Sequence, residues 1–224
     1  GTTTLAQGFQ VAADNPLVGL DGRAALLRRL GTVAAATPAV FGTPARLGHI
    51  YDYLVAHARE RAITAGFLFA TLLRALGPVW PPRQVLEGVA LGDCWRHPAA
   101  RAANPADPTD GYVPFHKLTQ WLAYSLLEPL EEAGLTVTGL DELTGLPEYR
   151  NGGLLLDLGL LVPKDADFLR RAHAVGDEAV VEWRALTVIA LDRIAAAVRE
   201  VLGVSAQAFP LARVLEGGTW AAGR

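Results

Sequence analysis

"DEAVVEWRALTVIALDRIAAAVREVLG", residues 177–203, is the longest stretch of the sequence with a single periodicity. Its apolar residues recur at intervals of three to five, which is typical of an amphipathic helix that buries one face. Gly203 follows the last of them and is a common helix stop, so the pattern predicts one long helix ending there. The apolar positions that mark the expected buried face are Val181, Leu186, Ile189, Ile194 and Val198.

Helical patterns also fill most of the first third of the chain. Residues 20–36 have a leucine-rich face at helical spacing, and Asp21 is the expected N-cap. Two more helices are expected within residues 46–60 and 62–77. Because the second of these is apolar on nearly every side, we expect it at the centre of the core.

The middle of the chain alternates between irregular and helical patterns. Residues 81–114 are dense in Pro, Gly, Asp and Asn, which predicts a long irregular segment with a short strand near 87–93. A helix is then expected over residues 115–132, bent or ended by Pro129. A short apolar helix is predicted at 152–161.

These patterns predict a mainly α-helical protein with one or two short strands. With 224 residues the chain can bury one sizeable core, so we expect a single helical domain over residues 1–224. The sequence begins with Gly1 and contains no methionine, so we expect it to be the C-terminal portion of a longer chain. A missing N-terminal segment would then be a natural partner.

Charge and composition exclude several classes of protein. The net charge of -3 provides no field suited to general binding of nucleic acid or of an anionic membrane. Charged residues interrupt every apolar run before it reaches the length of a membrane span. One cysteine, Cys94, excludes an internal disulfide framework. We therefore expect a soluble, cytoplasmic protein.

One of only two lysines lies at the start of the helix expected from residue 115. If that segment is helical, Lys117, Trp121 and Tyr124 share one face, with His116 and Gln120 beside them. The lysine either extends past the edge of the core or lies in a pocket that tunes its charge. Arginine is the usual cation of this chain, so a lysine here indicates a position that requires a compact ammonium rather than a planar guanidinium.

The stretch "LPEYRNGG", residues 146–153, places a carboxylate, a phenol and a guanidinium side by side. Glu148, Tyr149 and Arg150 are together suited to orienting a polar substrate. The amides of Gly152 and Gly153, at the start of a helix, are suited to holding an anion such as phosphate. The alternative is an ordinary surface turn in which the carboxylate pairs with the guanidinium.

A third cluster, "LGDCWRHP", occupies residues 91–98. Asp93 and Trp95 are candidate site residues, and a nucleophilic Cys94 paired with His97 is a weaker alternative. There is no second cysteine and no HxxxH pair, so no metal site is predicted. The sequence also lacks GxGxxG, GxxxxGK[ST] and GxSxG, which removes the usual support for nucleotide-fuelled and serine-hydrolase functions. No cofactor is expected.

Several motifs resemble the uracil-catabolism family of fungi and bacteria, which is tied to the degradation of uracil by way of a ribosylated urea. The resemblance covers nearly the whole chain. The stretches that carry it are "DNPLVGLDGRAALLRRLG", "LGDCWRHP", "VPFHKLTQWLAYSLLEPLEEAGL", "LTGLPEYRNGGLLLDLGLL", "VVEWRALTVIALDRI" and "LEGGTW".

A more distant resemblance concerns the queuosine salvage proteins, which hydrolyse the N-glycosidic bond of a nucleoside 5'-phosphate. "PFHKLTQ" and "LTGLPEYRNGGLLLDLGLL" are similar to two motifs of that family. Lys117 matches its lysine, and Glu148, Tyr149 and Arg150 match its Asp-Tyr-Arg. The carboxylate is one methylene longer here. The resemblance implies a helical fold similar to that of DNA glycosylases.

Together the two resemblances imply an N-ribosyl hydrolase acting on a ribosylated urea or a pyrimidine-derived nucleoside 5'-phosphate. Glu148 would stabilise the positive sugar or activate water, with Lys117 assisting and Asp93 as a second acid. The residues expected to bind this small substrate are His116, Tyr149, Arg150, Gly152, Gly153, Trp95 and Trp121. The alternatives are a non-catalytic nucleotide-binding or scaffolding protein and an amide or ureide hydrolase of the same pathway.

Overall fold

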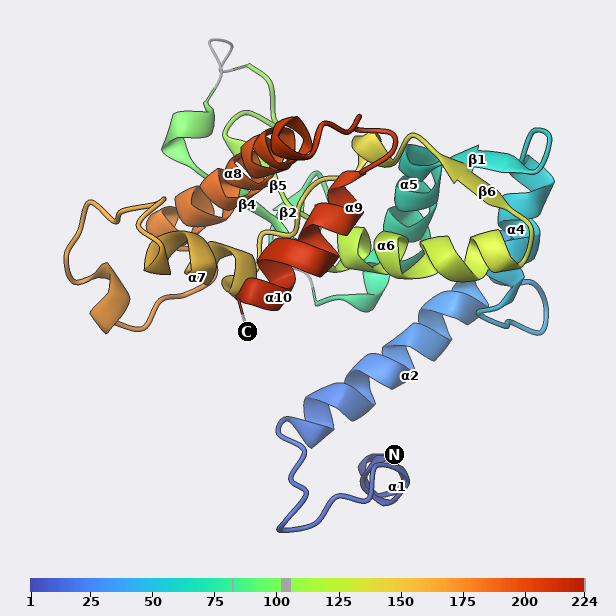
Figure 1. Cartoon of the computed structure of the whole chain (residues 1–224). Helices are drawn as coiled ribbons and strands as arrows, with labels where there is room; N and C mark the ends of the chain where they lie inside the picture. Colours follow the sequence, from blue (N-terminus) through green and yellow to red (C-terminus); the bar gives the residue numbers. More distant parts are fainter. Residues whose placement is uncertain (82, 102–105, 224) are drawn as a thin grey trace.

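Helices account for most of the chain in the computed structural model, which describes residues 1–81, 83–101 and 106–223 (Figure 1). The mainly α prediction is confirmed. The α-helices are α1 (Thr2–Gly8), α2 (Leu20–Ala36), α3 (Pro38–Phe41), α4 (His49–His57), α5 (Ala65–Leu76), α6 (Lys117–Glu132), α7 (Tyr149–Asp157), α8 (Glu178–Leu202), α9 (Leu211–Val214) and α10 (Trp220–Ala222). Short 3-10 turns lie at η1 (Gly77–Val79), η2 (Pro98–Ala100), η3 (Leu140–Glu142) and η4 (Phe168–Arg170), and η5 (Leu215–Thr219) is a π-helix.

Short strands pair two by two rather than in one sheet. The parallel pair joins β1 (Ala62–Thr64) to β6 (Thr136–Thr138). The antiparallel pairs join β2 (Val85–Leu86) to β3 (Val89–Ala90), and β4 (Cys94–Arg96) to β5 (Tyr112–Pro114). The expected strand near residue 90 is present as β3. The predicted number of one or two strands was too low, because the described residues form six. Strands of two or three residues are too short to show an alternating pattern.

The largest core lies where α4, α5 and α6 pack against the parallel pair of strands. Leu68 and Leu72 of α5 are fully buried there, which confirms the central place expected for this helix. The β1 strand leads directly into α5, and the Thr64 hydroxyl caps the helix by accepting the Phe67 amide at 3.0 Å. Helices α5 and α6 pack directly against each other in this core.

Helix α8 buries only part of its predicted face, including Val181. Val181, Thr187, Leu191 and Ala195 are buried, whereas Leu186 and Ile189 are 39% and 50% exposed. Thr187 and Ala195 are buried although larger apolar residues of α8 are exposed. Their small side chains let neighbouring segments approach the helix closely. The prediction for Leu186 and Ile189 was therefore wrong.

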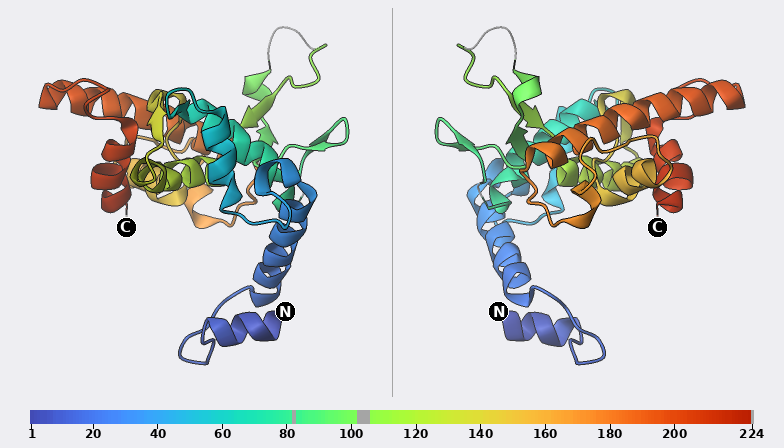
Figure 2. Two further views of the ribbon diagram at one scale, coloured as in Figure 1. Left: turned by 90° about the vertical axis from the view of Figure 1, so that its right-hand side faces the viewer. Right: turned by 90° about the vertical axis from the view of Figure 1, so that its left-hand side faces the viewer.

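Helices α1 and α2 form an arm that projects from the rest of the chain (Figures 1 and 2). Val33 and Ala34, near the end of α2, are buried against the body, but Leu27 is 53% exposed. Asp21 lies in the first turn of α2 and accepts a hydrogen bond from the Thr2 hydroxyl at 3.1 Å. The N-cap is instead Gly19, whose left-handed backbone starts the helix, so the expected cap was wrong.

Within the described part of the chain, no helix is both long enough and apolar enough to cross a membrane.

Two leucines of α8 test which face stabilises the fold. We expect Leu191→Ala to lower the free energy of unfolding by about 3 kcal/mol, because it leaves a cavity at a fully buried position. Leu186→Ala on the same helix should cost about 1 kcal/mol or less. Urea denaturation of both variants measures the difference, and equal losses would contradict the observed orientation of α8.

Candidate functional site

A cavity of about 1120 Å³ opens between the end of α5, residues 77–81 and 83–94, the start of α6 and the first turns of α8. Its size exceeds the 300–1,000 Å³ or so of typical ligand sites, so a nucleotide-sized molecule would fit. Its walls are mostly apolar. The charged side chains on them are Arg74, Arg83, Asp93, Lys117, Glu148 and Arg184.

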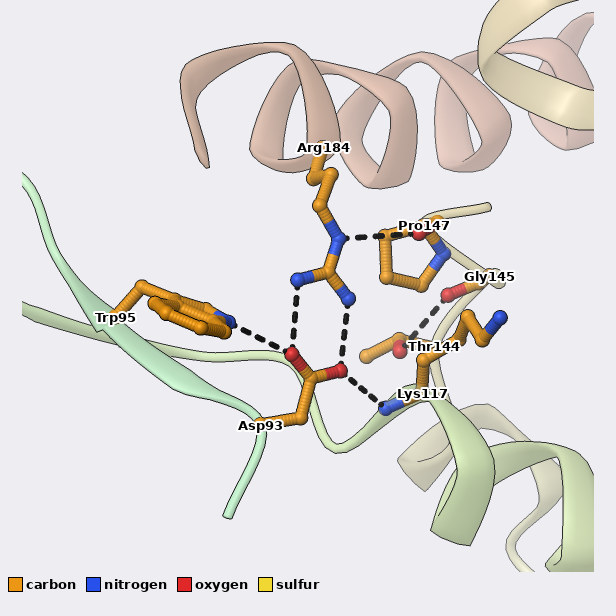
Figure 3. A network of polar contacts seen from close by, with 7 residues as sticks. All are labelled: Asp93, Trp95, Lys117, Thr144, Gly145, Pro147 and Arg184. Atoms are coloured by element: carbon orange, nitrogen blue, oxygen red, sulfur yellow. Dashed lines mark hydrogen bonds and ion pairs between the residues drawn. The ribbon is translucent and has the colours of Figure 1, made fainter. Parts of the chain in front are cut away.

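Asp93 and Arg184 form a bidentate ion pair at this cavity (Figure 3). The two guanidinium–carboxylate distances are 2.8 and 2.7 Å. Trp95 donates its indole N–H to one carboxylate oxygen at 2.8 Å, and the Lys117 amide donates to the other at 3.1 Å. A carboxylate offers about four lone-pair positions, so these four bonds saturate Asp93.

The backbone of Asp93 also fixes the start of α6. Its carbonyl oxygen accepts the amides of Phe115 at 2.9 Å and His116 at 3.1 Å, immediately before the Lys117 amide meets the side chain. His116 adopts φ 45°, a left-handed conformation that is uncommon for any residue other than glycine. Three successive amides bound to one aspartate hold this conformation and set the direction in which Lys117 leaves the helix.

Arg184 extends the same network to a third segment. Its Nε donates to the Pro147 carbonyl at 3.2 Å, next to Glu148, and its guanidinium lies 4.2 Å from the centre of the Phe115 ring. One arginine on α8 therefore ties together the β4 strand, the start of α6 and the segment before α7.

Asp93 remains ionised throughout the physiological range. Burial disfavours its charge, but the hydrogen bonds and charge of Arg184, with smaller contributions from Trp95 and the Lys117 amide, outweigh burial and lower the pKa of Asp93 to about 2. With its lone pairs engaged, this carboxylate is a poor proton acceptor near neutral pH. These bonds fit a positioning role for Asp93, and the catalytic role expected from the sequence stays a prediction.

Glu148 lines the cavity and is also the N-cap of α7. Its two carboxylate oxygens accept the amides of Arg150 at 3.0 Å and Asn151 at 2.8 Å. The positive end of the helix favours a negative charge there. These bonds use about half of the acceptor positions, so the carboxylate can still bind a water or a sugar.

Lys117 and His116 line the cavity at the start of α6. The Lys117 side chain extends away from Asp93 (Figure 3), and no ion pair or hydrogen bond of its ammonium is found among the described residues. Burial lowers the pKa of His116, although the charge of Asp93 opposes that effect. The imidazole is therefore neutral at pH 7.

Of the two site residues expected directly after Glu148, only Tyr149 lines the cavity. Tyr149 lines the cavity although it is 69% exposed. Arg150 is not among the lining residues, and its guanidinium lies over the rings of Trp220 and Tyr149, at 5.1 and 5.8 Å from their centres.

The two glycines of "LPEYRNGG" do not offer free amides to an anion. The Gly152 amide donates to the Glu148 carbonyl at 2.9 Å as part of α7. Gly153 is the fifth residue of that helix, beyond the four whose amides lack a helical partner. Gly152 is instead a packing residue, because a Cβ there would lie 2.9 Å from Trp183.

The two tryptophans expected to stack on a substrate do not line the cavity. Trp95 is 7% exposed and packs with Phe115 and Val181 behind Asp93. Trp121 is 46% exposed on α6. The cavity presents Trp80 and Trp183 instead, and sequence reasoning missed both together with Arg74, Arg83 and Arg184. Trp183 and Arg184 lie in the stretch "VVEWRALTVIALDRI", but no local pattern marked either as a site residue.

The described residues do not favour two other chemistries considered from the sequence. Burial, followed by the charge of Asp93, raises the pKa of the Cys94 thiol. No hydrogen bond is found between it and His97, whose Nδ1 accepts the Ala99 amide. No cluster of three His, Cys, Asp or Glu suited to a metal occurs in residues 1–81, 83–101 and 106–223.

Residues 1–224 match the family described as "Protein of unknown function (DUF1688)". The chain belongs to this family. It is 38% identical over 241 residues to uracil catabolism protein 4 of Lachancea kluyveri, covering 97% of this chain and 54% of that protein. It is also 38% identical over 226 residues to protein urg3 of Schizosaccharomyces pombe, covering 98% of this chain and 52% of that protein.

These relatives confirm the resemblance to uracil-catabolism proteins seen in the motifs. The chain spans about half the length of the curated relatives it matches. No solved structure matches it, so the similarity in fold to DNA glycosylases stays a prediction.

The Asp93–Arg184 pair predicts a pH-dependent stability. We expect Asp93→Asn to lower the free energy of unfolding at pH 7 by about 2 kcal/mol, less than for a fully buried pair because the Asp93 side chain is 27% exposed. Because the folded pKa lies below the ordinary value of 3.8, this stability is present above that pH and is lost as the pH falls toward about 2.

The difference between the wild type and Asp93→Asn should therefore be constant from pH 7 to about 5 and shrink below about 4. Asp165→Asn is the matched control, since Asp165 pairs with Arg171 on the surface at 2.9 Å. It should cost no more than about 0.5 kcal/mol. Denaturant titrations at several pH values measure both, and a difference independent of pH down to 2 would contradict the ion-pair assignment.

Proposed function

We propose that this protein hydrolyses the N-glycosidic bond of a ribosylated urea or of a pyrimidine-derived nucleoside 5'-phosphate in uracil catabolism. The observation that carries the proposal is the shared cavity, which Glu148 and Lys117 both line from segments about thirty residues apart. The names of the relatives support the pathway. The resemblance to the queuosine salvage motifs supports the type of bond.

The geometry suits the charge that develops during this reaction. Cleavage of a C1'–N bond passes through an oxocarbenium-like state, positive at the sugar. The Glu148 carboxylate is held at the N-terminus of α7 by two amides, so it is fixed in place before substrate binds. There it would stabilise the positive sugar and orient or deprotonate the attacking water.

Lys117 supplies the complementary charge. Its ammonium would fix the Glu148 carboxylate, hold the water or donate a proton toward the departing nitrogen. Asp93 contributes indirectly, because it binds the amide of Lys117 and, through Arg184, the carbonyl next to Glu148. His116 would bind substrate as a neutral imidazole, and Trp80 or Trp183 offers a flat surface to a urea or a base.

Glu148→Gln tests the proposal in the family-length protein. The protein is incubated with ribosylurea, its 5'-phosphate and pyrimidine nucleotides, and mass spectrometry follows free urea or base together with the reducing sugar. We expect the variant to lose about a hundredfold or more in turnover, because glutamine carries no charge to stabilise the sugar. Full activity in Glu148→Gln would overturn the assignment.

The loss of a helix cap must be separated from the loss of chemistry. Thr64→Ala is the matched control, because it removes the side-chain cap of α5 and does not touch the cavity. It should cost about 1 kcal/mol of stability and leave turnover unchanged. Saturable binding without cleavage, together with tolerance of Lys117→Met, would favour a non-catalytic binding protein. Urea released without a freed sugar would favour a ureide hydrolase.

A further inference from the structure

The cavity carries more positive charge than its own carboxylates balance. Four cationic side chains and two carboxylates on its walls leave a net charge of +2, although the whole chain has a net charge of -3. Arg184 is neutralised by Asp93, which leaves Arg74, Arg83 and Lys117 with one further carboxylate, Glu148, in the same cavity. Arg74 and Arg83 are the two arginines among these three cations.

Neither arginine has an acidic partner among the described residues. Arg74 lies in the last turn of α5 and is exposed at the cavity wall. Arg83 follows in the segment after η1, and its guanidinium lies 5.6 Å from the centre of the Trp95 ring. The positions outside the described ranges, 82, 102–105 and 224, contribute no acidic side chain.

The apolar surroundings of Arg74 and Arg83 strengthen the electric field of these two charges. The same cavity is lined by Leu73, Pro78, Leu86 and Leu91, and apolar walls of this kind focus the field of nearby charges. An arginine whose only role is to be solvated at the surface gains nothing from a position in an apolar cavity. Two unpaired guanidinium groups in one cavity suit a ligand that carries two negative charges, and planar forks of donors match phosphate oxygens.

We propose that Arg74 and Arg83 form a binding site for a phosphate monoester, so that the substrate of this cavity is the phosphorylated form. A phosphate monoester carries a charge of about -1.5 to -2 at pH 7, which matches the excess of +2. This inference rests on the proposed function for the rest of the substrate. It moves the anion site away from Arg150, which does not line the cavity, and from the Gly152 amide, which is bonded within α7.

Calorimetric binding of ribose 5-phosphate, ribose and inorganic phosphate to the family-length protein tests this site. We expect ribose 5-phosphate to bind at least about tenfold more tightly than ribose, because charged hydrogen bonds form only with the ester. Arg74→Gln and Arg83→Gln should each remove about tenfold of that affinity. Inorganic phosphate should compete weakly, and binding as tight as that of the ester would mean that free phosphate is the ligand.

Arg193→Gln is the matched control, because Arg193 is exposed on α8 and does not line the cavity. It should leave the affinity unchanged. Equal affinities for ribose and ribose 5-phosphate, or equal losses in all three variants, would overturn the proposal. If a glutamine variant fails to fold, the salt dependence of wild-type binding decides, since an affinity for ribose 5-phosphate independent of salt excludes the ionic site.

The result is separable from the outcome for catalysis. Selective binding of ribose 5-phosphate without hydrolysis of any ribosyl substrate would support the arginine site and refute the hydrolase. Hydrolysis of unphosphorylated ribosylurea at the same rate as its 5'-phosphate would support the hydrolase and refute the arginine site.

Discussion

The ion pair between Asp93 and Arg184 is the interaction on which the geometry of the site depends. It lies between residues 91 positions apart, and each partner makes further bonds that reach a different segment. Asp93 fixes the turn that begins α6, and Arg184 fixes the carbonyl before Glu148. The two side chains proposed to act on the substrate therefore take their positions from one contact, and neither needs a bond to the other.

The backbone conformation of His116 is the unfavourable part of the arrangement around the Asp93–Arg184 pair. A left-handed histidine is unfavourable by itself, and it persists only because the surrounding bonds determine it more strongly than its own preference. Asp93 accepts three successive amides there, two through its carbonyl oxygen and one through its carboxylate. The direction of the Lys117 side chain is thus a property of the aspartate as much as of the helix that the lysine begins.

Much of the fold could be predicted from the sequence, and the site only in part. The all-round apolar pattern of α5 placed it in the core, because a helix without a polar face has nowhere else to lie. The buried face of α8 could be predicted only in part, since Val181 is buried as expected but Thr187 and Ala195 are buried in place of Leu186 and Ile189. Glu148 and Lys117 stood out by residue type within their motifs. Arg74, Arg83 and Arg184 did not, because one arginine among many has no local signal of the partner that it meets or lacks.

Glu148 has a structural role as the N-cap of α7 and a proposed chemical role in the cavity. Ser, Thr, Asp and Asn are the preferred N-caps, because their short side chains reach the first amides directly. A glutamate at this position gains little as a cap and loses more side-chain freedom. Here it uses both oxygens to hold two amides, yet its carboxylate still lines a cavity that contains an unpaired ammonium. A residue chosen only to start α7 would not need that extra reach. The longer side chain is explained if the carboxylate must be rigid, charged and exposed to a ligand at the same time.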